Sequence, residues 1–122
     1  MPWTYHQSTG QLYHNGTLVG TGYSGSGNTT SSGRNNPAMQ QMHNQGPIPQ
    51  GTWQIGTAYQ HAQKGPTSMN LTNTSGNTFG RSAFMIHGNN AQNNASQGCI
   101  ILPPTVRQQI ANSTDKTLIV VP

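Results

Sequence analysis

The apolar residues of this chain fall into short runs, and this spacing most constrains what the chain can fold into. Stretches rich in glycine, proline, serine and asparagine separate the runs, for example residues 73–80. Short apolar runs bounded by turn-forming residues are typical of β-strands, whereas a helix needs a longer segment of period 3.6. The sequence therefore predicts a small, loop-rich, mainly β domain.

The positions of turn-forming residues predict the order of the elements. Asn15-Gly16 is a strong signal for a two-residue hairpin, and Pro37 stands where a short helix can begin. The expected strands lie at 3–5, 12–14, 17–19, 52–59, 69–71, 82–87, 100–102 and 117–121, with short helices at 37–43 and 104–110 and a mobile loop at 24–36.

The chain is unusually polar, yet its composition favours a folded protein. Serine, threonine, asparagine and glutamine supply 51 of the 122 residues, while charged residues make up only 5%. Disordered chains normally combine low hydropathy with high charge, and here the charge is missing. A chain of this length buries a sizeable core, so we expect one domain spanning residues 1–122.

The few charged residues exclude several classes of function. Five Lys and Arg residues are spread along the chain without a cluster, which argues against nucleic-acid binding. Asp115 is the single acidic residue, so glycoside hydrolysis by a carboxylate pair is excluded. No apolar stretch approaches the roughly 20 residues of a membrane span. The formal charge of +4 suits an anionic polymer such as a bacterial wall.

Cys99 and His87 are the candidate catalytic pair. A thiol becomes a good nucleophile when an imidazole takes its proton, and the imidazolium can then protonate a leaving amine. With one carboxylate in the chain, a backbone carbonyl or an amide side chain is expected to orient the imidazole. The alternative from spacing alone is that Cys99, next to Ile100 and Ile101, is a small buried apolar residue.

The residues just before Cys99 support a catalytic interpretation. Gly98 allows a sharp backbone turn and close approach of a substrate, and N–H groups around Gly98 and Cys99 are candidate oxyanion donors. Ser96 is close enough to bond this loop or to assist at the site. The candidate substrate contacts are Arg81, Gln97, Gly88 and Trp53.

Two of these substrate contacts have competing structural roles. Strand alternation would place Arg81 on the same face as His87, where it can clamp a carboxylate, but a solvated arginine fits equally. Trp53 suits a core position as well as a substrate platform. A zinc site of His87, Cys99 and another histidine would lack a nearby carboxylate base, so we expect no metal and no cofactor.

The ordered motifs resemble a known superfamily. His87-Gly88 followed by Ser96-Gln97-Gly98-Cys99-Ile100 resembles the signature of L,D-transpeptidase (YkuD-like) catalytic domains, and the segment 46–55 resembles their Pro-x-Gly-x-aromatic-x-Ile stretch. Within it, the chain is most similar to the type VI secretion L,D-transpeptidase-like effectors (Tlde1, DUF2778). Further similar stretches lie at 4–12, 36–40 and 79–82.

The resemblance implies both a fold and a function. The implied fold is a YkuD-like β-sandwich or barrel with one or two short helices, and the implied function is an attack on peptidoglycan. Cys99 would attack the carbonyl at the L-centre of diaminopimelate in peptidoglycan stem peptides and release D-alanine, with His87 as base and then acid. The acyl-enzyme would pass to water or to a free D-amino acid. The implied partners are a cognate immunity protein and the type VI secretion machinery. We expect a monomer, secreted without a signal peptide, that acts in the periplasm of a target bacterium.

Two positions depart from the wall-building enzymes. Many of those carry His where this chain has Gln97, and Arg or Asn where it has Ile101. These departures favour trimming and exchange of stem peptides over cross-linking. A cross-linking L,D-transpeptidase and a non-catalytic wall-binding module remain the alternatives.

Overall fold

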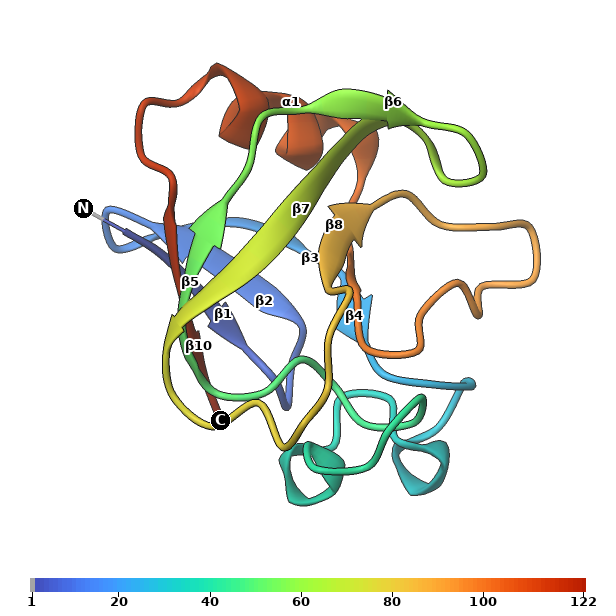
Figure 1. Ribbon diagram of the computed structural model, residues 1–122. Helices are drawn as coiled ribbons and strands as arrows, with labels where there is room; N and C mark the ends of the chain where they lie inside the picture. The colour runs from blue at the N-terminus through green and yellow to red at the C-terminus, as the bar shows by residue number, and fades with distance from the viewer. Residues whose placement is uncertain (1) are drawn as a thin grey trace.

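The computed structural model describes residues 2–122 as a curved β-sheet with short helical segments (Figure 1). The strands are β1 (Trp3–His6), β2 (Gln11–His14), β3 (Thr17–Thr21), β4 (Tyr23–Ser24), β5 (Gly51–Ile55), β6 (Tyr59–His61), β7 (Gly65–Ser75), β8 (Met85–His87), β9 (Ile100–Ile101) and β10 (Thr117–Val121). The helical segments are the 3-10 turns η1 (Thr30–Ser32) and η2 (Pro37–Met39) and the α-helix α1 (Pro104–Asn112).

The sheet curls into a nearly closed barrel, which confirms the mainly β prediction. Its strand order is β3-β2-β1-β10-β5-β7-β8-β9-β4, and β6 pairs with β7. Most neighbours are antiparallel, but β1 pairs with β10 in parallel, and so does β8 with β9. The last strand therefore lies inside the sheet, between β1 and β5.

The core lies inside the barrel and is built by strand alternation. Burial alternates along β1 and along β10, because successive side chains point to opposite faces of a strand. Both tryptophans are buried at 2% exposure, and α1 closes the core with Val106 and Ile110. Each such buried apolar side chain contributes about 1.5–3 kcal/mol.

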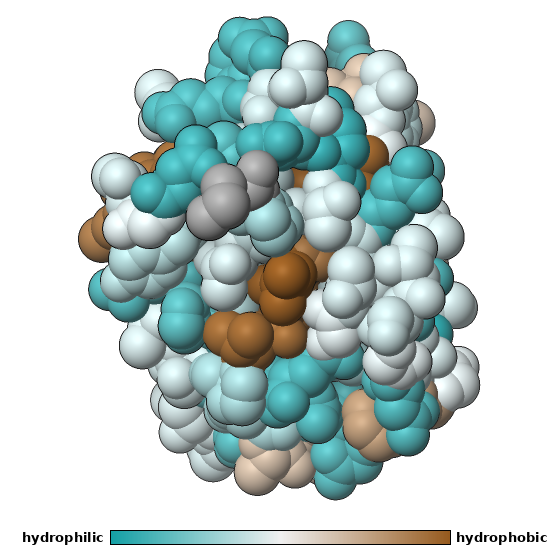
Figure 2. Space-filling view, turned by 90° about the vertical axis from the view of Figure 1, so that its left-hand side faces the viewer, coloured by the Kyte–Doolittle hydropathy of each residue, from teal (hydrophilic) through white to brown (hydrophobic). Residues whose placement is uncertain are grey.

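Most polar residues lie at the surface, and the buried polar ones are Gln7, Ser24, Ser68, Arg81, His87, Ser96 and Arg107. Figure 2, turned to the left-hand side of Figure 1, shows a face of mainly hydrophilic and intermediate residues, with a small apolar patch near its centre and a few more apolar atoms toward its edges. This arrangement explains how a chain with only 30% hydrophobic residues still folds. No helix among residues 2–122 is long and apolar enough to cross a membrane.

Several expected elements differ in extent. The strand expected at 82–87 begins only at Met85, because Ala83 has φ of 64° and cannot continue a β-ladder. The strand expected at 52–59 ends at Ile55, and β6 starts afresh at Tyr59. The helix expected at 37–43 is only the 3-10 turn η2. β7 is much longer than the predicted 69–71, because it pairs with β5, β6 and β8.

The connection between β8 and β9 determines where the site forms. Parallel strands need a connection that returns to the starting end of the sheet, and here the segment 88–99 makes it. In Figure 1 this segment projects from the right-hand side of the barrel. The loop at 24–36, expected to be mobile, lies against it: the Gly25 N–H donates to Ser96 Oγ at 3.0 Å.

Candidate active site

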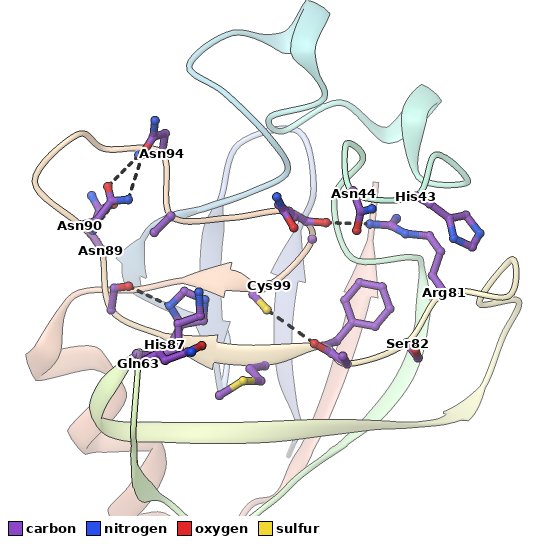
Figure 3. A pocket seen from close by; sticks show the side chains of 18 of the residues that line it. His43, Asn44, Gln63, Arg81, Ser82, His87, Asn89, Asn90, Asn94 and Cys99 are labelled. Carbon is purple, nitrogen blue, oxygen red and sulfur yellow. Dashed lines mark hydrogen bonds between the residues drawn. The ribbon is translucent and has the colours of Figure 1, made fainter.

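His87 and Cys99 line the same pocket because β8 and β9 pair in register. His87 is the last residue of β8 and Cys99 immediately precedes β9, with Ile86 opposite Ile100 in the ladder. Both residues line a pocket of about 650 Å³ (Figure 3). The two residues that the sequence singled out as a catalytic pair therefore share one cavity.

The His87 ring is held by the backbone next to it. Its side chain is 1% exposed, and Nδ1 lies 2.8 Å from the Gly88 carbonyl oxygen. Because a carbonyl only accepts hydrogen bonds, Nδ1 carries the proton and Nε2 holds the lone pair. Nε2 is buried and has no hydrogen-bond partner among the described residues. The orienting group is thus a backbone carbonyl, as expected for a chain with one acid.

The surroundings of His87 keep the imidazole neutral. Burial lowers the pKa of His87, the hydrogen bond to Gly88 opposes this, and the charges of Lys64 and Arg107 lower the pKa further. A neutral imidazole with an unpartnered Nε2 is the form that accepts a proton. The site therefore holds a base rather than a preformed imidazolium.

The Cys99 thiol is half-buried and neutral. It points toward Ala83, whose carbonyl oxygen lies 3.8 Å from Sγ (Figure 3). Burial raises the pKa of Cys99, while a hydrogen bond from the Met85 backbone and the charges of Lys64 and Arg81 oppose that rise. Within residues 2–122 no hydrogen bond joins Sγ to the His87 ring. The structure shows a resting thiol that must turn before it can transfer its proton.

Two serine hydroxyls hold the turn that presents Cys99. Ser96 Oγ donates to the Cys99 carbonyl at 2.6 Å and accepts the Gly98 N–H at 3.0 Å. Ser24 Oγ donates to the Gly98 carbonyl at 2.7 Å and accepts the Ile48 N–H at 2.8 Å. Ser96, predicted as a site residue, is thus a positioning residue, and sequence analysis missed Ser24.

These bonds change which N–H groups can act as oxyanion donors. The Gly98 N–H, one of the expected donors, is already bonded to Ser96 and is not free. The Cys99 N–H has no hydrogen-bond partner in the part of the chain that the structure describes. Cys99 therefore keeps its own N–H available for a substrate oxygen, as an oxyanion donor requires.

Gly98 is required by close packing as well as by its backbone. Its φ is 140°, and a Cβ there would lie 2.6 Å from Arg81 Nη2 and 2.8 Å from Phe84 Cε1. Only glycine lets the turn approach these two side chains. The prediction of a tight turn before Cys99 agrees with this geometry.

Arg81 has a structural set of partners in place of the predicted substrate carboxylate. It is 7% exposed, and its terminal nitrogens donate to four carbonyl oxygens, those of Gln40, Gly46, Pro47 and Gln97. A bidentate clamp would need these bonds to break. Arg81 instead ties the segment 40–47 to the turn before Cys99. It does not lie in a strand with His87, so the alternation argument was wrong.

The other predicted substrate contacts divide between pocket and core. Gln97 and Gly88 line the pocket, and Gln97 is exposed at its rim. Trp53 does not line it: the side chain is 2% exposed, packs edge-on against Phe84 and donates from Nε1 to the Pro49 carbonyl at 3.1 Å. The prediction of a Trp53 substrate contact is therefore corrected to a core role.

Sequence analysis missed the residues that hold the segment 88–95. The Tyr23 hydroxyl donates to Asn89 Oδ1 at 2.6 Å and accepts the Ala95 N–H at 2.9 Å. Arg34 lies 3.5 Å from the Tyr23 ring centroid and donates to the Asn93 carbonyl at 2.9 Å. No motif marks these residues, because each acts across a gap of more than 50 positions.

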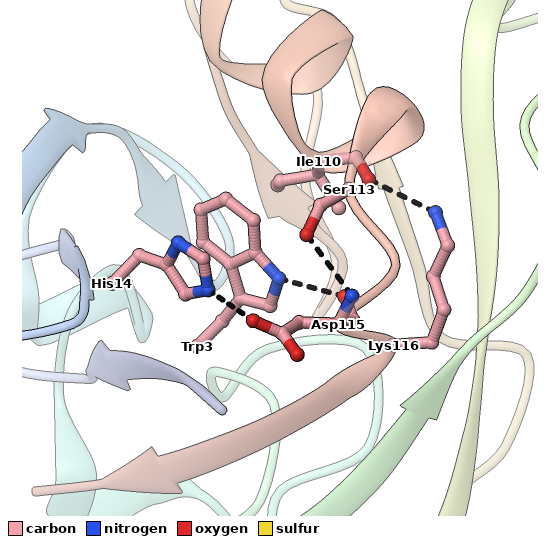
Figure 4. A network of polar contacts seen from close by, with 6 residues as sticks. All are labelled: Trp3, His14, Ile110, Ser113, Asp115 and Lys116. Atoms are coloured by element: carbon pink, nitrogen blue, oxygen red, sulfur yellow. Dashed lines mark hydrogen bonds and ion pairs between the residues drawn. The ribbon is translucent and has the colours of Figure 1, made fainter. Parts of the chain in front are cut away.

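The single acid of the chain lies outside this site. Asp115 Oδ2 is 2.7 Å from His14 Nε2, and the Asp115 carbonyl accepts the Trp3 indole N–H at 2.8 Å (Figure 4). The lining residues of the Cys99 pocket include Lys64 and Arg81 but no acid. Among the described residues, no three His, Cys, Asp or Glu side chains gather as metal ligands would.

A comparison with protein-family models agrees with the motifs. Residues 19–122 match the model described as the Tlde1 domain; the match begins within β3, extends past β10 and includes both His87 and Cys99. No curated protein matches the chain. Since the match spans most of its length, the chain belongs to the Tlde1 domain family.

Proposed function

We propose that this chain is an antibacterial effector that trims peptidoglycan stem tetrapeptides as a cysteine L,D-carboxypeptidase and exchanges their terminal D-alanine. The match to the Tlde1 domain supports the effector role, because it suggests a family of type VI secretion effectors. The observation that carries the chemistry is the shared pocket of Cys99 and a neutral His87 with an unpartnered Nε2.

The reaction begins with the thiol turning from Ala83 toward the imidazole. Nε2 of His87 takes the Sγ proton, and the thiolate attacks the carbonyl carbon at the L-centre of diaminopimelate. The carbonyl oxygen becomes an oxyanion that the Cys99 N–H can bind. The C–N bond to D-alanine then breaks, and the His87 imidazolium gives its proton to the leaving amine.

The acyl-enzyme is resolved by a second nucleophile. His87 takes a proton from water, the hydroxide attacks the thioester carbonyl, and the thiolate leaves and is reprotonated. This path yields a tripeptide stem. If the amine of a free D-amino acid attacks instead, the stem regains a tetrapeptide with a new terminal residue.

The effector family supports a proposal about where the reaction takes place. We propose delivery by the type VI machinery into the periplasm of a rival bacterium, where the wall lies, and action as a monomer. A cognate immunity protein that covers the Cys99 pocket would protect the producing cell. The absence of acids from the lining of this pocket suits both an anionic substrate and an acidic inhibitor surface.

The test is digestion of purified muropeptides with the native protein and with Cys99→Ala, followed by chromatography and mass spectrometry. Native protein should convert tetrapeptide stems to tripeptides and, with added D-methionine, to D-methionine stems. Cys99→Ala should do neither. Dimeric stems would point to a cross-linking transpeptidase instead. Unchanged stems with intact wall binding would support a non-catalytic wall-binding module.

A further inference from the structure

A second pocket of about 660 Å³ adjoins the site of Cys99 and gathers positive charge. The two pockets share Lys64, Gly88 and Asn89 in their linings. Three of the five Lys and Arg residues of the chain, Arg34, Lys64 and Arg107, line the second pocket. No acid is among its lining residues, and the charges stand in a hollow that reaches the backbone beside His87.

Arg107 is buried there with one nitrogen uncommitted. It is 8% exposed, Nε donates to the Leu102 carbonyl at 3.0 Å and Nη1 to the Pro66 carbonyl at 2.9 Å. Nη2 makes no hydrogen bond within the described residues. Burying a guanidinium without an anion costs free energy, which a carboxylate ligand would recover.

The free nitrogen lies against the backbone of the catalytic segment. A Cβ on Gly88 would come within 2.9 Å of Arg107 Nη2, so the glycine leaves the space that the guanidinium uses. The Gly88 carbonyl is the one that orients His87. Arg81 is also buried, but its terminal nitrogens are bonded to four carbonyls. Arg107 and Arg81 are therefore both buried, and Arg107 differs from Arg81 in having a terminal nitrogen without a hydrogen bond.

Two further features of the second pocket favour an anion. Lys64 is exposed on the turn between β6 and β7 and can swing toward a bound group. Pro103 and Pro104, at the start of α1, form part of the wall, which places the positive end of the helix dipole there. Arg107, Lys64 and the helix start thus act on the same space.

We propose that this second pocket binds a carboxylate of a reactant, with Arg107 Nη2 and Lys64 Nζ as its donors. The inference rests on the proposed function, because stem peptides and free D-amino acids both carry carboxylates. A bound carboxylate would also offset the charge of Arg107 beside His87. The imidazole would then become a stronger base when the pocket is filled.

Binding to catalytically inactive protein tests the inference directly. In the Cys99→Ala background, calorimetry would compare a tetrapeptide stem with the same peptide amidated at every carboxylate, that of the terminal D-alanine included. We expect amidation to weaken binding about tenfold, the size of one charge-assisted hydrogen bond. Lys64→Gln and Arg107→Lys should remove most of this difference in affinity. The control is Lys116→Gln, which removes the same charge as Lys64→Gln from a residue outside both pockets. It should preserve the difference.

A second arm distinguishes the acceptor as the source of the carboxylate. With otherwise native protein, the ratio of exchange to hydrolysis would be measured with D-methionine and with D-methioninamide. If the pocket takes the acceptor, Lys64→Gln lowers the ratio of exchange to hydrolysis with D-methionine about tenfold and does not alter that ratio with D-methioninamide. Circular dichroism and thermal unfolding would verify that Arg107→Lys folds. If Arg107→Lys does not fold, the test rests on Lys64→Gln, which changes a residue on an exposed turn.

The possible outcomes separate this inference from the proposed function. Two results together would overturn the carboxylate pocket. The two peptides would bind equally, and Lys64→Gln and Arg107→Lys would change the exchange ratio no more than Lys116→Gln does. Failure of the native protein to cleave any tetrapeptide overturns the proposed function instead. The calorimetric arm, which needs no turnover, would still decide whether the pocket recognises carboxylates.

Discussion

His87 and His14 are each held by a hydrogen bond at one ring nitrogen, but by opposite kinds of partner. His14 Nε2 lies 2.7 Å from the only carboxylate in the chain, that of Asp115, and its ring stacks on Trp3 with centroids 3.8 Å apart. His87 is held by the neutral Gly88 carbonyl, and no acid lines its pocket. A carboxylate stabilises an imidazolium, whereas a carbonyl orients the ring without adding charge.

This difference explains how the chain supplies a base. The surroundings of His87 favour its neutral form, and its Nε2 is left for a proton from Cys99. The Asp115–His14 pair joins β2 to the segment before β10 and has a structural role. The proposed base, His87, is oriented by the Gly88 carbonyl and has no carboxylate partner among the described residues.

The largest expected effect separates the two histidines by activity. His87→Ala should lower tetrapeptide cleavage by about 10²–10⁴-fold, the usual contribution of a general acid–base group. His14→Ala should leave the rate within about twofold, since His14 does not line the Cys99 pocket and its loss affects stability alone. Cleavage assays on folded samples of both variants measure this. Equal losses in the two variants would contradict the assignment of the base.

The second prediction compares glycines in the two regions. Gly98→Ala should strongly reduce both folding and cleavage, because the new Cβ would meet Arg81 Nη2 at 2.6 Å in a backbone of φ 140°. Gly16→Ala, in the turn after His14, has φ of 77° but open space around it, so only backbone strain of about 1–2 kcal/mol remains. Urea unfolding of both variants measures the difference. A Gly98→Ala protein as stable as Gly16→Ala would refute the close packing.

The third prediction compares two serines, Ser96 beside Cys99 and Ser113 beside Asp115. Ser96→Ala leaves the Gly98 N–H, the Gly25 N–H and the Cys99 carbonyl without their shared partner, and should cost about 1–3 kcal/mol. Ser113→Ala removes one bond, to the Asp115 N–H, and should cost about 1 kcal/mol or less. Ser96→Ala should also slow cleavage by displacing Cys99. Normal kcat with full stability would mean that Ser96 does not position the turn.

The smallest expected effect is on the pH dependence of stability. The pKa of His87 is lowered by burial, so its contribution is fully present above its usual value near 6.5 and is lost as pH falls below it. The pKa of Asp115 is lowered by its bond to His14, so that contribution is lost only as pH falls below about 3.8. His87→Gln should flatten the curve below pH 6.5, and Asp115→Asn the curve near pH 3.5. Midpoints of urea unfolding measured from pH 8 to 3 test this. If the two groups were coupled, both variants would change the stability over the same pH range, against the prediction.

Much of the fold follows from local sequence signals. The Asn15-Gly16 hairpin, α1 and β10 lie close to where turn residues and apolar runs predicted them. The errors arise where tertiary contacts override local preference. β7 extends over eleven mostly polar residues because three strands pair with it, and the run 82–87 is interrupted at Ala83 by a left-handed backbone.

The sequence by itself led to the proposed reaction class. Composition excluded carboxylate-pair mechanisms, and spacing alone left Cys99 open as either a nucleophile or a buried apolar residue. The resemblance of the ordered His-Gly…Ser-x-Gly-Cys motif to a known superfamily then favoured cysteine acyl transfer. Composition and ordered motifs can both be detected along a single chain.

Only the tertiary structure decided which neighbours serve the pair. It assigned Arg81 to backbone carbonyls, Trp53 to the core, and Arg107 to a charged hollow beside His87. It also paired Asp115 with His14 and buried His87, and this burial lowers the pKa of the His87 imidazole. These outcomes depend on strand pairing that brings distant segments within a few ångströms, and such contacts leave no pattern along the chain.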